Sequence, residues 1–316
     1  MTSIASRHAL LLALAFLGLT AAGVSGNARP PAGDAAPAAG AYIKRSGEYF
    51  KTPAAAAKAA RDGDIVEILA GVYKEDVAVW KQDNLTLRGV NGRAHLAADG
   101  KAAEGKAIWV VKGDNVTIEN IEFSGARATD RNGAGIRLEG AGLTIRNCYF
   151  HDNENGILGG HPQGDVLIEH SEFADNGTGD GRTHNMYIGK GRNFTLRHSR
   201  THHARVGHNV KTRAAHNVIE DNVIYDGETG NSSYAIDVAN GGTARIQRNL
   251  IQKGPRAENK TFIRYGAEGL KYPDNTLVIE DNVFIDDLPG GGRLYQAKGV
   301  EARFHGNVTA GGGGGG

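Results

Sequence analysis

A strand-and-turn pattern that recurs nine times along the chain constrains its fold more than any other feature of the sequence. Each copy contains a short strand of alternating apolar residues, followed by a polar turn. The central residues of successive strands are 23 to 33 positions apart, with a mean of about 27. These centres are Leu87, Ile118, Ile145, Ile168, Leu196, Ile219, Ile246, Ile279 and Phe304. Such a period, without long helical segments, predicts a parallel β-solenoid in which each repeat forms one coil.

Polar residues also recur at a fixed position in the repeats. Asn222, Asn249, Asn282 and Asn307 stand three residues after the centres of the last four copies, and Ser171 and Ser199 hold the same place in earlier copies. We expect these side chains to stack in a ladder that satisfies the buried backbone groups of successive coils. Their predicted role is structural.

The repeats divide the chain into four parts. Residues 1–26 carry Arg7 and His8, then an apolar run over 9–20 and a cluster of small residues, which is the order of a secretory signal peptide. The run is too short to span a bilayer, so we expect a secreted or periplasmic protein without membrane insertion. Residues 27–49 predict a flexible linker, 50–310 the solenoid domain, and 311–316 a disordered glycine tail.

One short helix is expected before the first coils. Thr52 can cap its N-terminus, Pro53 suits the first helical position, and alanine dominates residues 53–60. This helix would cover the open N-terminal end of the stack, where an edge strand otherwise exposes unpaired backbone groups.

Composition excludes several classes of protein. The 36 Lys and Arg balance 35 Asp and Glu, which argues against a nucleic-acid partner. Cys148 is the only cysteine, so no intrachain disulfide can form. Glycine makes up 46 of 316 residues, about double its average share, and predicts a turn-dense fold. We expect a monomer.

Three short segments resemble the opening coils of a known superfamily. Residues 63–68 (GDIVEI), 71–73 (GVY) and 84–89 (NLTLRG) resemble right-handed parallel β-helix proteins of the pectate-lyase-like superfamily, and the resemblance covers roughly residues 50–310. It implies an all-β, single-stranded right-handed parallel β-helix. That superfamily includes polysaccharide lyases, glycoside hydrolases, uronate epimerases and non-catalytic segments, so fold alone does not choose the reaction.

A second strand in each coil predicts where a functional face lies. Because side chains alternate along a strand, the residue after each inward centre faces outward, and stacking places these residues in one column. The inward centres are Ile136, Ile157, Met186, Val210, Ile236, Ile263 and Leu294, and the outward column is Arg137, Leu158, Tyr187, Lys211, Asp237, Arg264 and Tyr295. Asn185, Asn209 and Arg213 are expected in the same exposed patch, beside a groove left by Gly160 and Gly189.

A cationic groove on such a fold favours a uronate-containing acidic polysaccharide as substrate, because each sugar carries a carboxylate. We predict Tyr187, His208, Lys211 and Arg213 as catalytic residues of a polysaccharide lyase that cleaves by β-elimination. Tyr187, His208 or Lys211 would take the C5 proton, and Tyr187 would protonate the leaving group. The predicted substrate-binding residues are His184, Asn185, Asn209, Asp237 and Arg264.

Electrostatic interactions with neighbouring residues are expected to support these roles. Arg213 or Arg264, with Asn185 or Asn209, would neutralise the sugar carboxylate. Clustered cations are expected to lower the proton affinity of Lys211 and to favour a tyrosinate at Tyr187.

Four histidines lie close together in this part of the sequence. His184 and His208 either bond to backbone at the strand entrance or border the groove, and His202 and His203 are expected in a surface turn. No ligand motif accompanies them, so neither a metal nor another cofactor is predicted.

Other functions stay open. Return of the proton to the opposite face of the sugar would make the same residues a C5-epimerase. A hydrolase needs two carboxylates, for which Asp180, Asp226 and Glu228 would have to lean over the groove beside Asp237. A non-catalytic glycan-binding solenoid would use aromatic platforms, and Tyr187, Tyr295 and Phe262 are the candidates on this face. The charged face would otherwise serve solubility alone.

Overall fold

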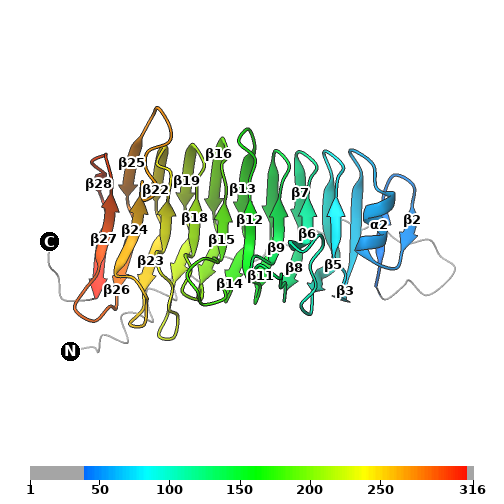
Figure 1. The fold of residues 1–316 in the computed structure, drawn as a ribbon, viewed down its shortest axis with the longest axis horizontal. Helices are drawn as coiled ribbons and strands as arrows, with labels where there is room; N and C mark the ends of the chain where they lie inside the picture. Colours follow the sequence, from blue (N-terminus) through cyan, green and yellow to red (C-terminus); the bar gives the residue numbers. More distant parts are fainter. Residues whose placement is uncertain (1–38, 312–316) are drawn as a thin grey trace. The chain divides into compact units, whose positions relative to one another are not determined.

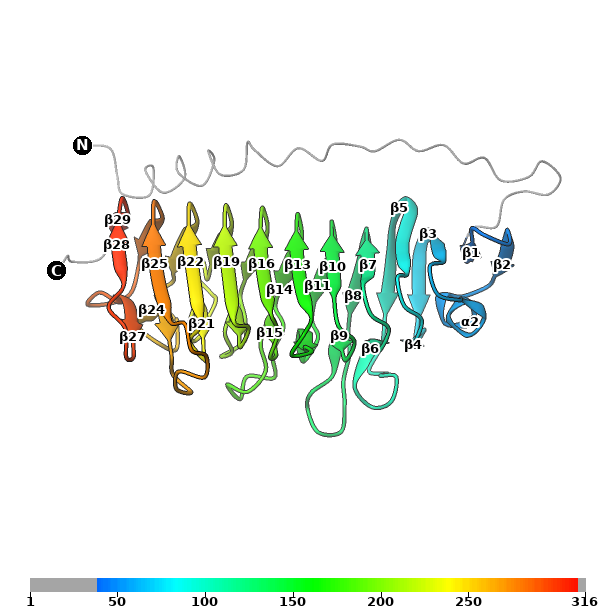
Figure 2. The ribbon, with the colours of Figure 1, turned by 90° about the horizontal axis from the view of Figure 1, so that it is seen from above.

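The computed structural model describes residues 39–311, and all of its secondary-structure elements lie in one compact unit. The coils stack side by side along one axis, from α2 at one end to β28 and β29 at the other (Figures 1 and 2). The elements form a parallel β-helix, which confirms the predicted fold class. The predicted signal peptide (1–26) and the tail beyond Gly311 lie outside the described residues.

Each coil contributes strands to two sheets (Figure 2). The first row of the 20-stranded sheet consists of β3 (Ile65–Lys74), β5 (Thr86–Ala97), β7 (Val116–Glu119), β10 (Leu143–Arg146), β13 (Asp165–Glu169), β16 (Asn193–Arg197), β19 (His216–Glu220), β22 (Thr243–Gln247), β25 (Thr276–Glu280) and β28 (Arg303–His305). Its second row consists of β8 (Ile121–Ser124), β11 (Tyr149–His151), β14 (Glu172–Ala174), β17 (Arg200–His202), β20 (Val223–Tyr225), β23 (Leu250–Lys253), β26 (Val283–Asp286) and β29 (Val308–Gly311).

The second sheet has nine parallel strands. They are β4 (Ala78–Trp80), β6 (Ala107–Val111), β9 (Ala134–Leu138), β12 (Asn155–Gly159), β15 (Met186–Ile188), β18 (Val210–Thr212), β21 (Ile236–Val238), β24 (Thr261–Tyr265) and β27 (Arg293–Ala297). This sheet carries the predicted functional face.

The register of the first row matches the predicted strand centres. Leu87 pairs with Ile118, Ile145 with Ile168, and Ile279 with Phe304, and the intermediate pairs follow the same alignment. Nearly all of these centres are fully buried. The apolar residues that recur in the sequence therefore form the side of each coil that faces the core.

The predicted polar ladder is present inside the coils. Backbone N–H groups of Ser171 and Ser199 donate to Ser199 Oγ and Asn222 Oδ1, at 3.2 and 3.0 Å. Asn222, Asn249 and Asn282 continue it, since each donates its own backbone N–H to the amide oxygen of the next Asn at 2.9–3.0 Å. Asn307 closes the row. The ladder thereby pairs buried backbone donors along the stack.

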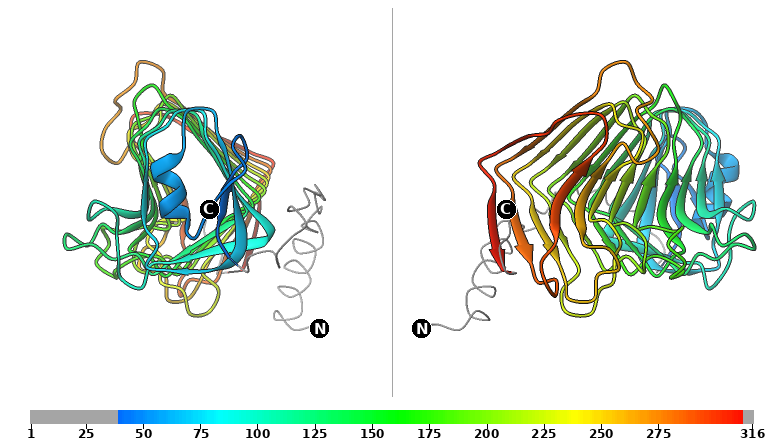
Figure 3. Two further views of the ribbon diagram at one scale, coloured as in Figure 1. Left: turned by 90° about the vertical axis from the view of Figure 1, so that its right-hand side faces the viewer. Right: turned by 60° about the vertical axis from the view of Figure 1, so that its left-hand side comes forward.

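The capping helix is also confirmed. α2 (Pro53–Ala59) has Thr52 as its N-cap and Pro53 in its first turn, and it lies across the N-terminal end of the stack (Figure 3). Ala56 and Ala57 are buried in the core, which explains the alanine-rich sequence. Two further strands, β1 (Ala41–Ile43) and β2 (Glu48–Phe50), form within residues expected to be linker. The folded domain therefore begins earlier than predicted, because β1 pairs with β3.

None of the helices formed by residues 39–311 has the length and apolar character needed to cross a membrane.

Candidate functional site

The outward column of the nine-stranded sheet has the predicted register over six strands. Arg137, Leu158, Tyr187, Lys211, Asp237 and Arg264 pair in this order on neighbouring strands. At the next strand the prediction is wrong by one residue, because Tyr295 pairs with the inward Ile263 and Gln296 follows Arg264. Tyr295 packs against the core, and Phe262 is fully buried, so neither offers an aromatic platform.

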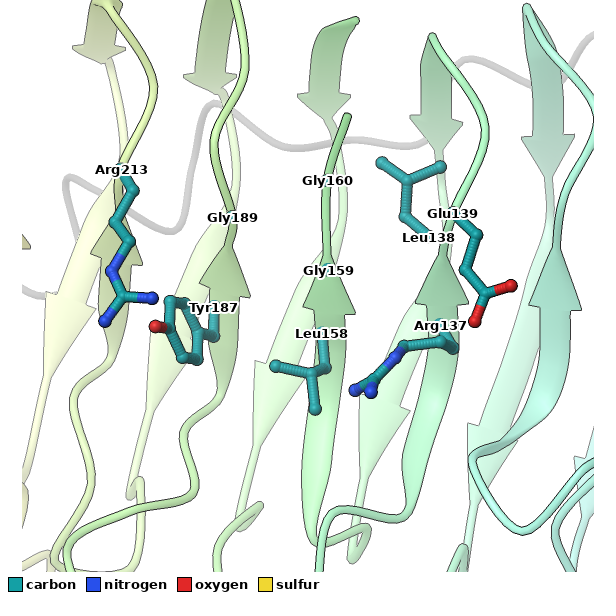
Figure 4. Close-up of a pocket in the computed structure, with 9 residues that line it drawn as sticks. All are labelled: Arg137, Leu138, Glu139, Leu158, Gly159, Gly160, Tyr187, Gly189 and Arg213. Atoms are coloured by element: carbon teal, nitrogen blue, oxygen red, sulfur yellow. The ribbon is translucent and has the colours of Figure 1, made fainter. Parts of the chain in front are cut away.

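Tyr187, Lys211 and Arg213 meet in the middle of this column. Lys211 Nζ lies 5.0 Å from the centroid of the Tyr187 ring, and Arg213 Cζ lies 4.9 Å from the same centroid. In Figure 4 the Arg213 guanidinium points toward the tyrosine ring. An amine and a guanidinium therefore flank one phenol, as the column predicts.

A cavity of about 450 Å³ opens beside Tyr187. Its lining includes Arg137, Glu139, Leu158 and Arg213, together with Gly160 and Gly189 (Figure 4). A Cβ atom on Gly160 would lie 2.9 Å from the Lys190 carbonyl oxygen, and one on Gly189 would lie 3.1 Å from Gly159 carbonyl carbon. A side chain at either position would come too close to the backbone, so glycine is favoured there. Because glycine has no side chain, the floor of the groove stays open.

Glu268 is a central residue that the sequence analysis did not single out. It accepts two hydrogen bonds from Arg213, at 2.7 and 2.8 Å, and lies 3.1 Å from Lys211 Nζ. It follows β24 in a loop whose Tyr272 hydroxyl donates to the Arg213 carbonyl oxygen. The loop belongs to the longest repeat, in which 33 residues separate Ile246 from Ile279, and this excess length was the available signal.

The same loop forms a second cavity of about 470 Å³, lined by Lys190, Arg213, Asn240, Glu268, Lys271 and Tyr272. Arg213 lines both cavities. It is thus the cation that the two cavities share.

Asp237 lies beneath Lys211. Its side chain is 3% exposed, with Oδ2 at 3.8 Å from Lys211 Nζ and 3.7 Å from His208 Nε2, while the buried Oδ1 accepts no hydrogen bond within residues 39–311. Burial raises the pKa of Asp237 to about 6, Glu268 adds to this effect, and Lys211 opposes it. A buried carboxyl group with such a pKa and an unpaired oxygen is a frequent feature of functional sites.

His184 and His208 stack at 4.6 Å, and each accepts a backbone N–H at Nδ1. A neutral imidazole that accepts at Nδ1 carries its proton on Nε2. Burial lowers the pKa of His208 to about 3 and the pKa of His184 well below its usual value, so both stay neutral. The sequence left open whether these histidines bond to the backbone or border the groove, and both bond to the backbone. His208 also directs its Nε2–H toward Asp237.

Asn185 and Asn209 do not lie in the exposed patch, so their predicted placement is wrong. Both are buried, and Asn185 donates to Asn209 Oδ1 at 2.9 Å. Asn185 also accepts from the backbone of Asn176, which in turn accepts from Asn153. The residues belong to a second interior ladder at the turn before the nine-stranded sheet, where strand alternation no longer sets the direction of side chains.

The predicted tyrosinate at Tyr187 is also contradicted. Burial raises the pKa of Tyr187 and outweighs the opposing effect of Arg213, while Glu268 and Asp237 raise it further. The predicted field counted only cations, whereas two carboxylates face Lys211. Tyr187 is therefore a proton donor at neutral pH.

The remaining predicted residues are placed as follows. Arg264 continues the column beyond Asp237 and donates to the Gln296 carbonyl oxygen at 3.4 Å. Asp226 is fully buried and lies 3.7 Å from Lys253, while Asp180 and Glu228 line neither cavity. Within the described part of the chain, no group of three potential metal ligands gathers in the groove.

Comparisons with known proteins agree with the architecture. The family model described as "Right handed beta helix region" matches residues 70–253. A solved alginate lyase from Paenibacillus sp. str. FPU-7 is similar over 82% of this chain and 93% of its own, with a TM-score of 0.59 and 16% identity. The A-module of the mannuronan C-5 epimerase AlgE6 from Azotobacter vinelandii covers 81% and 93%, with a TM-score of 0.36 and 14% identity. No curated protein matches the chain.

Proposed function

Since the chain belongs to the right-handed β-helix family, we propose that it is an exported enzyme that cleaves a uronate-containing polysaccharide by β-elimination. The observation that carries this proposal is the contact of Lys211 and Arg213 with the ring of Tyr187, since Tyr187 and Arg213 line the open groove and Lys211 lies directly beside them. The fold is shared with an alginate lyase, an enzyme of the same reaction class.

The first chemical requirement is neutralisation of the sugar carboxylate, because the C5 proton is otherwise too weakly acidic to remove. Arg213 would supply this charge, since its guanidinium lines both cavities and can bind a carboxylate with two hydrogen bonds. Its bidentate contact with Glu268 supports this role, because a uronate carboxylate would accept the same two hydrogen bonds in exchange.

A base and an acid are the second requirement, and the structure supports Lys211 and Tyr187 in these roles. His208 is a poor base because its Nδ1 accepts a backbone hydrogen bond and its Nε2 carries the proton. Lys211 would take the C5 proton as a neutral amine, after Asp237 Oδ2, 3.8 Å away, has accepted the proton of its ammonium group. Tyr187, protonated at neutral pH, would donate to the glycosidic oxygen as the C4–O4 bond breaks.

Hydrolysis is a second candidate, because the structure adds one carboxylate that the sequence analysis lacked. Burial raises the pKa of Asp237 to about 6, whereas hydrogen bonds from Arg213 and Lys211 outweigh burial and lower the pKa of Glu268. Two carboxyl groups whose pKa values differ in this way suit an acid and a base. Against this reading, Lys211 lies beside both groups, and Asp237 is almost fully buried.

A panel of acidic polysaccharides, alginate included, separates these reactions. Elimination creates a C4–C5 double bond that absorbs ultraviolet light, whereas hydrolysis yields reducing ends without absorbance. Epimerisation leads to deuterium uptake from solvent without cleavage, and a binder retains the polymer without turnover. We expect new absorbance, and turnover by any of the other routes would contradict the proposal.

Two substitutions test the assigned roles. We expect Lys211→Ala and Tyr187→Phe each to lower kcat by about 10²- to 10⁴-fold, the usual contribution of a general acid or base. Thermal unfolding of Tyr187→Phe should change little, because only the phenolic hydroxyl is removed, whereas Lys211→Ala also removes the cation beside Asp237, so its folding is checked separately. Lys74→Ala and Tyr149→Phe, outside the groove, are the matched controls. Full activity in either groove variant would refute its assignment.

A further inference from the structure

A cluster of two histidines and a glutamate lies on the 20-stranded sheet, away from the nine-stranded sheet that forms the groove. His95 in β5 pairs directly with Glu122 in β8, and His151 in β11 lies on the next coil. Their side chains are 19–25% exposed. The three residues thus belong to three successive coils and remain accessible to an ion from solvent.

The distances within the cluster suit a tetrahedral metal ion. Glu122 Oε1 lies 3.4 Å from His95 Nδ1 and 3.1 Å from His151 Nε2, and donor atoms of all three residues lie within 4.8 Å of one another. A tetrahedral Zn²⁺ with bonds of about 2.0–2.1 Å has neighbouring ligand atoms about 3.3 Å apart. Both separations therefore match the edges of such a tetrahedron.

In both imidazoles, the ring nitrogen that points away from Glu122 already has a hydrogen-bonding partner. His95 Nε2 lies 2.7 Å from Ser124 Oγ, and His151 Nδ1 lies 2.9 Å from Asp152 Oδ2. Arg205 fixes the other Asp152 oxygen at 2.6 Å. Metal-binding histidines characteristically donate their second ring N–H to such partners, which orients the lone pair of the other nitrogen. Here the other ring nitrogens, His95 Nδ1 and His151 Nε2, face Glu122, and a bound cation would replace any proton between them and the carboxylate.

We propose that His95, Glu122 and His151 bind one divalent transition-metal ion, Zn²⁺, which links three successive coils of the solenoid. Two imidazole nitrogens and one carboxylate oxygen favour Zn²⁺ over Ca²⁺ or Mg²⁺, which prefer oxygen ligands. Water would complete the fourth position. The ion would tie together β5, β8 and β11, whose coils otherwise interact through the sheet hydrogen bonds and the core.

A nearby pair of residues provides a matched control. Two coils further on, Glu172 Oε1 lies 3.2 Å from His202 Nε2, which repeats half of the cluster. There the outer nitrogen of His202 faces His203 Nδ1 at 2.8 Å. Within residues 39–311, only the His95 cluster brings three such ligands together. A His–Glu pair alone should bind Zn²⁺ far more weakly.

Equilibrium dialysis of the chelator-treated full chain against ZnCl₂ or CaCl₂ tests the proposal. We expect one tightly bound Zn²⁺ per chain and no comparable Ca²⁺. His151→Ala and Glu122→Gln should each weaken Zn²⁺ binding by about tenfold or more, and His202→Ala should bind like the wild type. Zn²⁺ should also raise the midpoint of thermal unfolding of the wild type but not of these two ligand variants.

Three outcomes would overturn the proposal: no stoichiometric Zn²⁺, equal binding of Ca²⁺, or binding by Glu122→Gln that matches the wild type. Because Glu122→Gln keeps the size and hydrogen-bonding capacity of the side chain, it guards against misfolding of the alanine variant. As a second measurement, wild-type protein loaded with Co²⁺ should show the visible absorption of a tetrahedral site, and added Zn²⁺ should abolish it.

Discussion

At the scale of single residues, Arg213 connects the parts of the candidate site. It contacts the Tyr187 ring, binds Glu268 through two hydrogen bonds, and lines both cavities. Glu268 in turn lies beside Lys211. A uronate that replaced Glu268 on Arg213 would therefore also change the charge around the proposed base.

Asp237 yields a prediction about pH and stability. Its pKa rises from the ordinary 3.8 to about 6 because the folded protein buries the carboxyl group. The folded state thus binds more protons than the unfolded state between these values, and the protonated carboxyl contributes stability that is present below pH 3.8 and lost as pH rises through about 6. Ionised Asp237 costs roughly 3 kcal/mol.

Asp237→Asn should remove this dependence. Relative to the wild type, the free energy of unfolding of the variant should increase by on the order of 2 to 3 kcal/mol between about pH 4 and about pH 7.5. Denaturant unfolding of both proteins at the two pH values measures this. A difference between the proteins that does not vary with pH would show that Asp237 keeps an ordinary pKa in the fold.

At the scale of elements, the interior ladders lie at the turns between strands, where their side chains accept hydrogen bonds from backbone N–H groups. Asn249 accepts from the backbone and side chain of Asn222 and donates to three carbonyl or amide oxygens, all buried. Its removal would leave several buried groups without partners, which costs more than the loss of one exposed hydrogen bond.

Asn249→Ala should therefore destabilise the protein by about 2 to 4 kcal/mol. Asn307→Ala, at the partly exposed end of the same ladder, should cost less, and Asn132→Ala on an exposed loop should stay within about 0.5 kcal/mol of the wild type. Unfolding free energies of the three variants provide the comparison. Equal costs for Asn249 and Asn132 would contradict a ladder that supports the stack.

Strands and loops differ in how far the sequence predicts them. Alternation along the strand and the repeat length were enough to align Tyr187, Lys211 and Asp237, because stacking copies one geometry from coil to coil. The position of Glu268 was not predicted, because its loop has no counterpart in other coils. The repeat therefore does not indicate where this loop folds back. Asn185 was misplaced because it precedes the strand, at a turn where alternation has no force.

The His95 cluster was missed for a related reason. His95, Glu122 and His151 come from three different repeats, so no short ligand motif marks them, and the sequence analysis examined histidines only where they were close along the chain. The raised pKa of Tyr187 was also not predictable. Burial raises it, and burial depends on neighbouring residues outside the outward column.

At the scale of the whole domain, the stacked coils place side chains from successive repeats along one long face. Arg137 and Arg213 line one cavity from strands three steps apart, a separation of about 14 Å at the usual spacing between strands. The Arg137 side chain has no hydrogen-bonding or ion-pair partner among residues 39–311. Under the proposed function, Arg137 would bind the carboxylate of a sugar next to the one that reacts.

Arg137→Gln should accordingly weaken binding of the polymer and spare the chemical step. We expect KM to rise about three- to tenfold with kcat within about twofold of the wild type, as for loss of an interaction that is equal in ground and transition states. Arg256→Gln, at an exposed position outside both cavities, is the control. A fall in kcat with unchanged KM would place Arg137 in the reaction itself.

The most direct test of the central claim is a crystal structure of the Lys211→Ala variant with a bound oligouronate. The account predicts sugars along the nine-stranded sheet, with one carboxylate on Arg213 and the adjoining glycosidic oxygen within hydrogen-bonding distance of the Tyr187 hydroxyl. An oligosaccharide bound on the other sheet, or one that crosses the groove without contacting Arg213 and Tyr187, would contradict it.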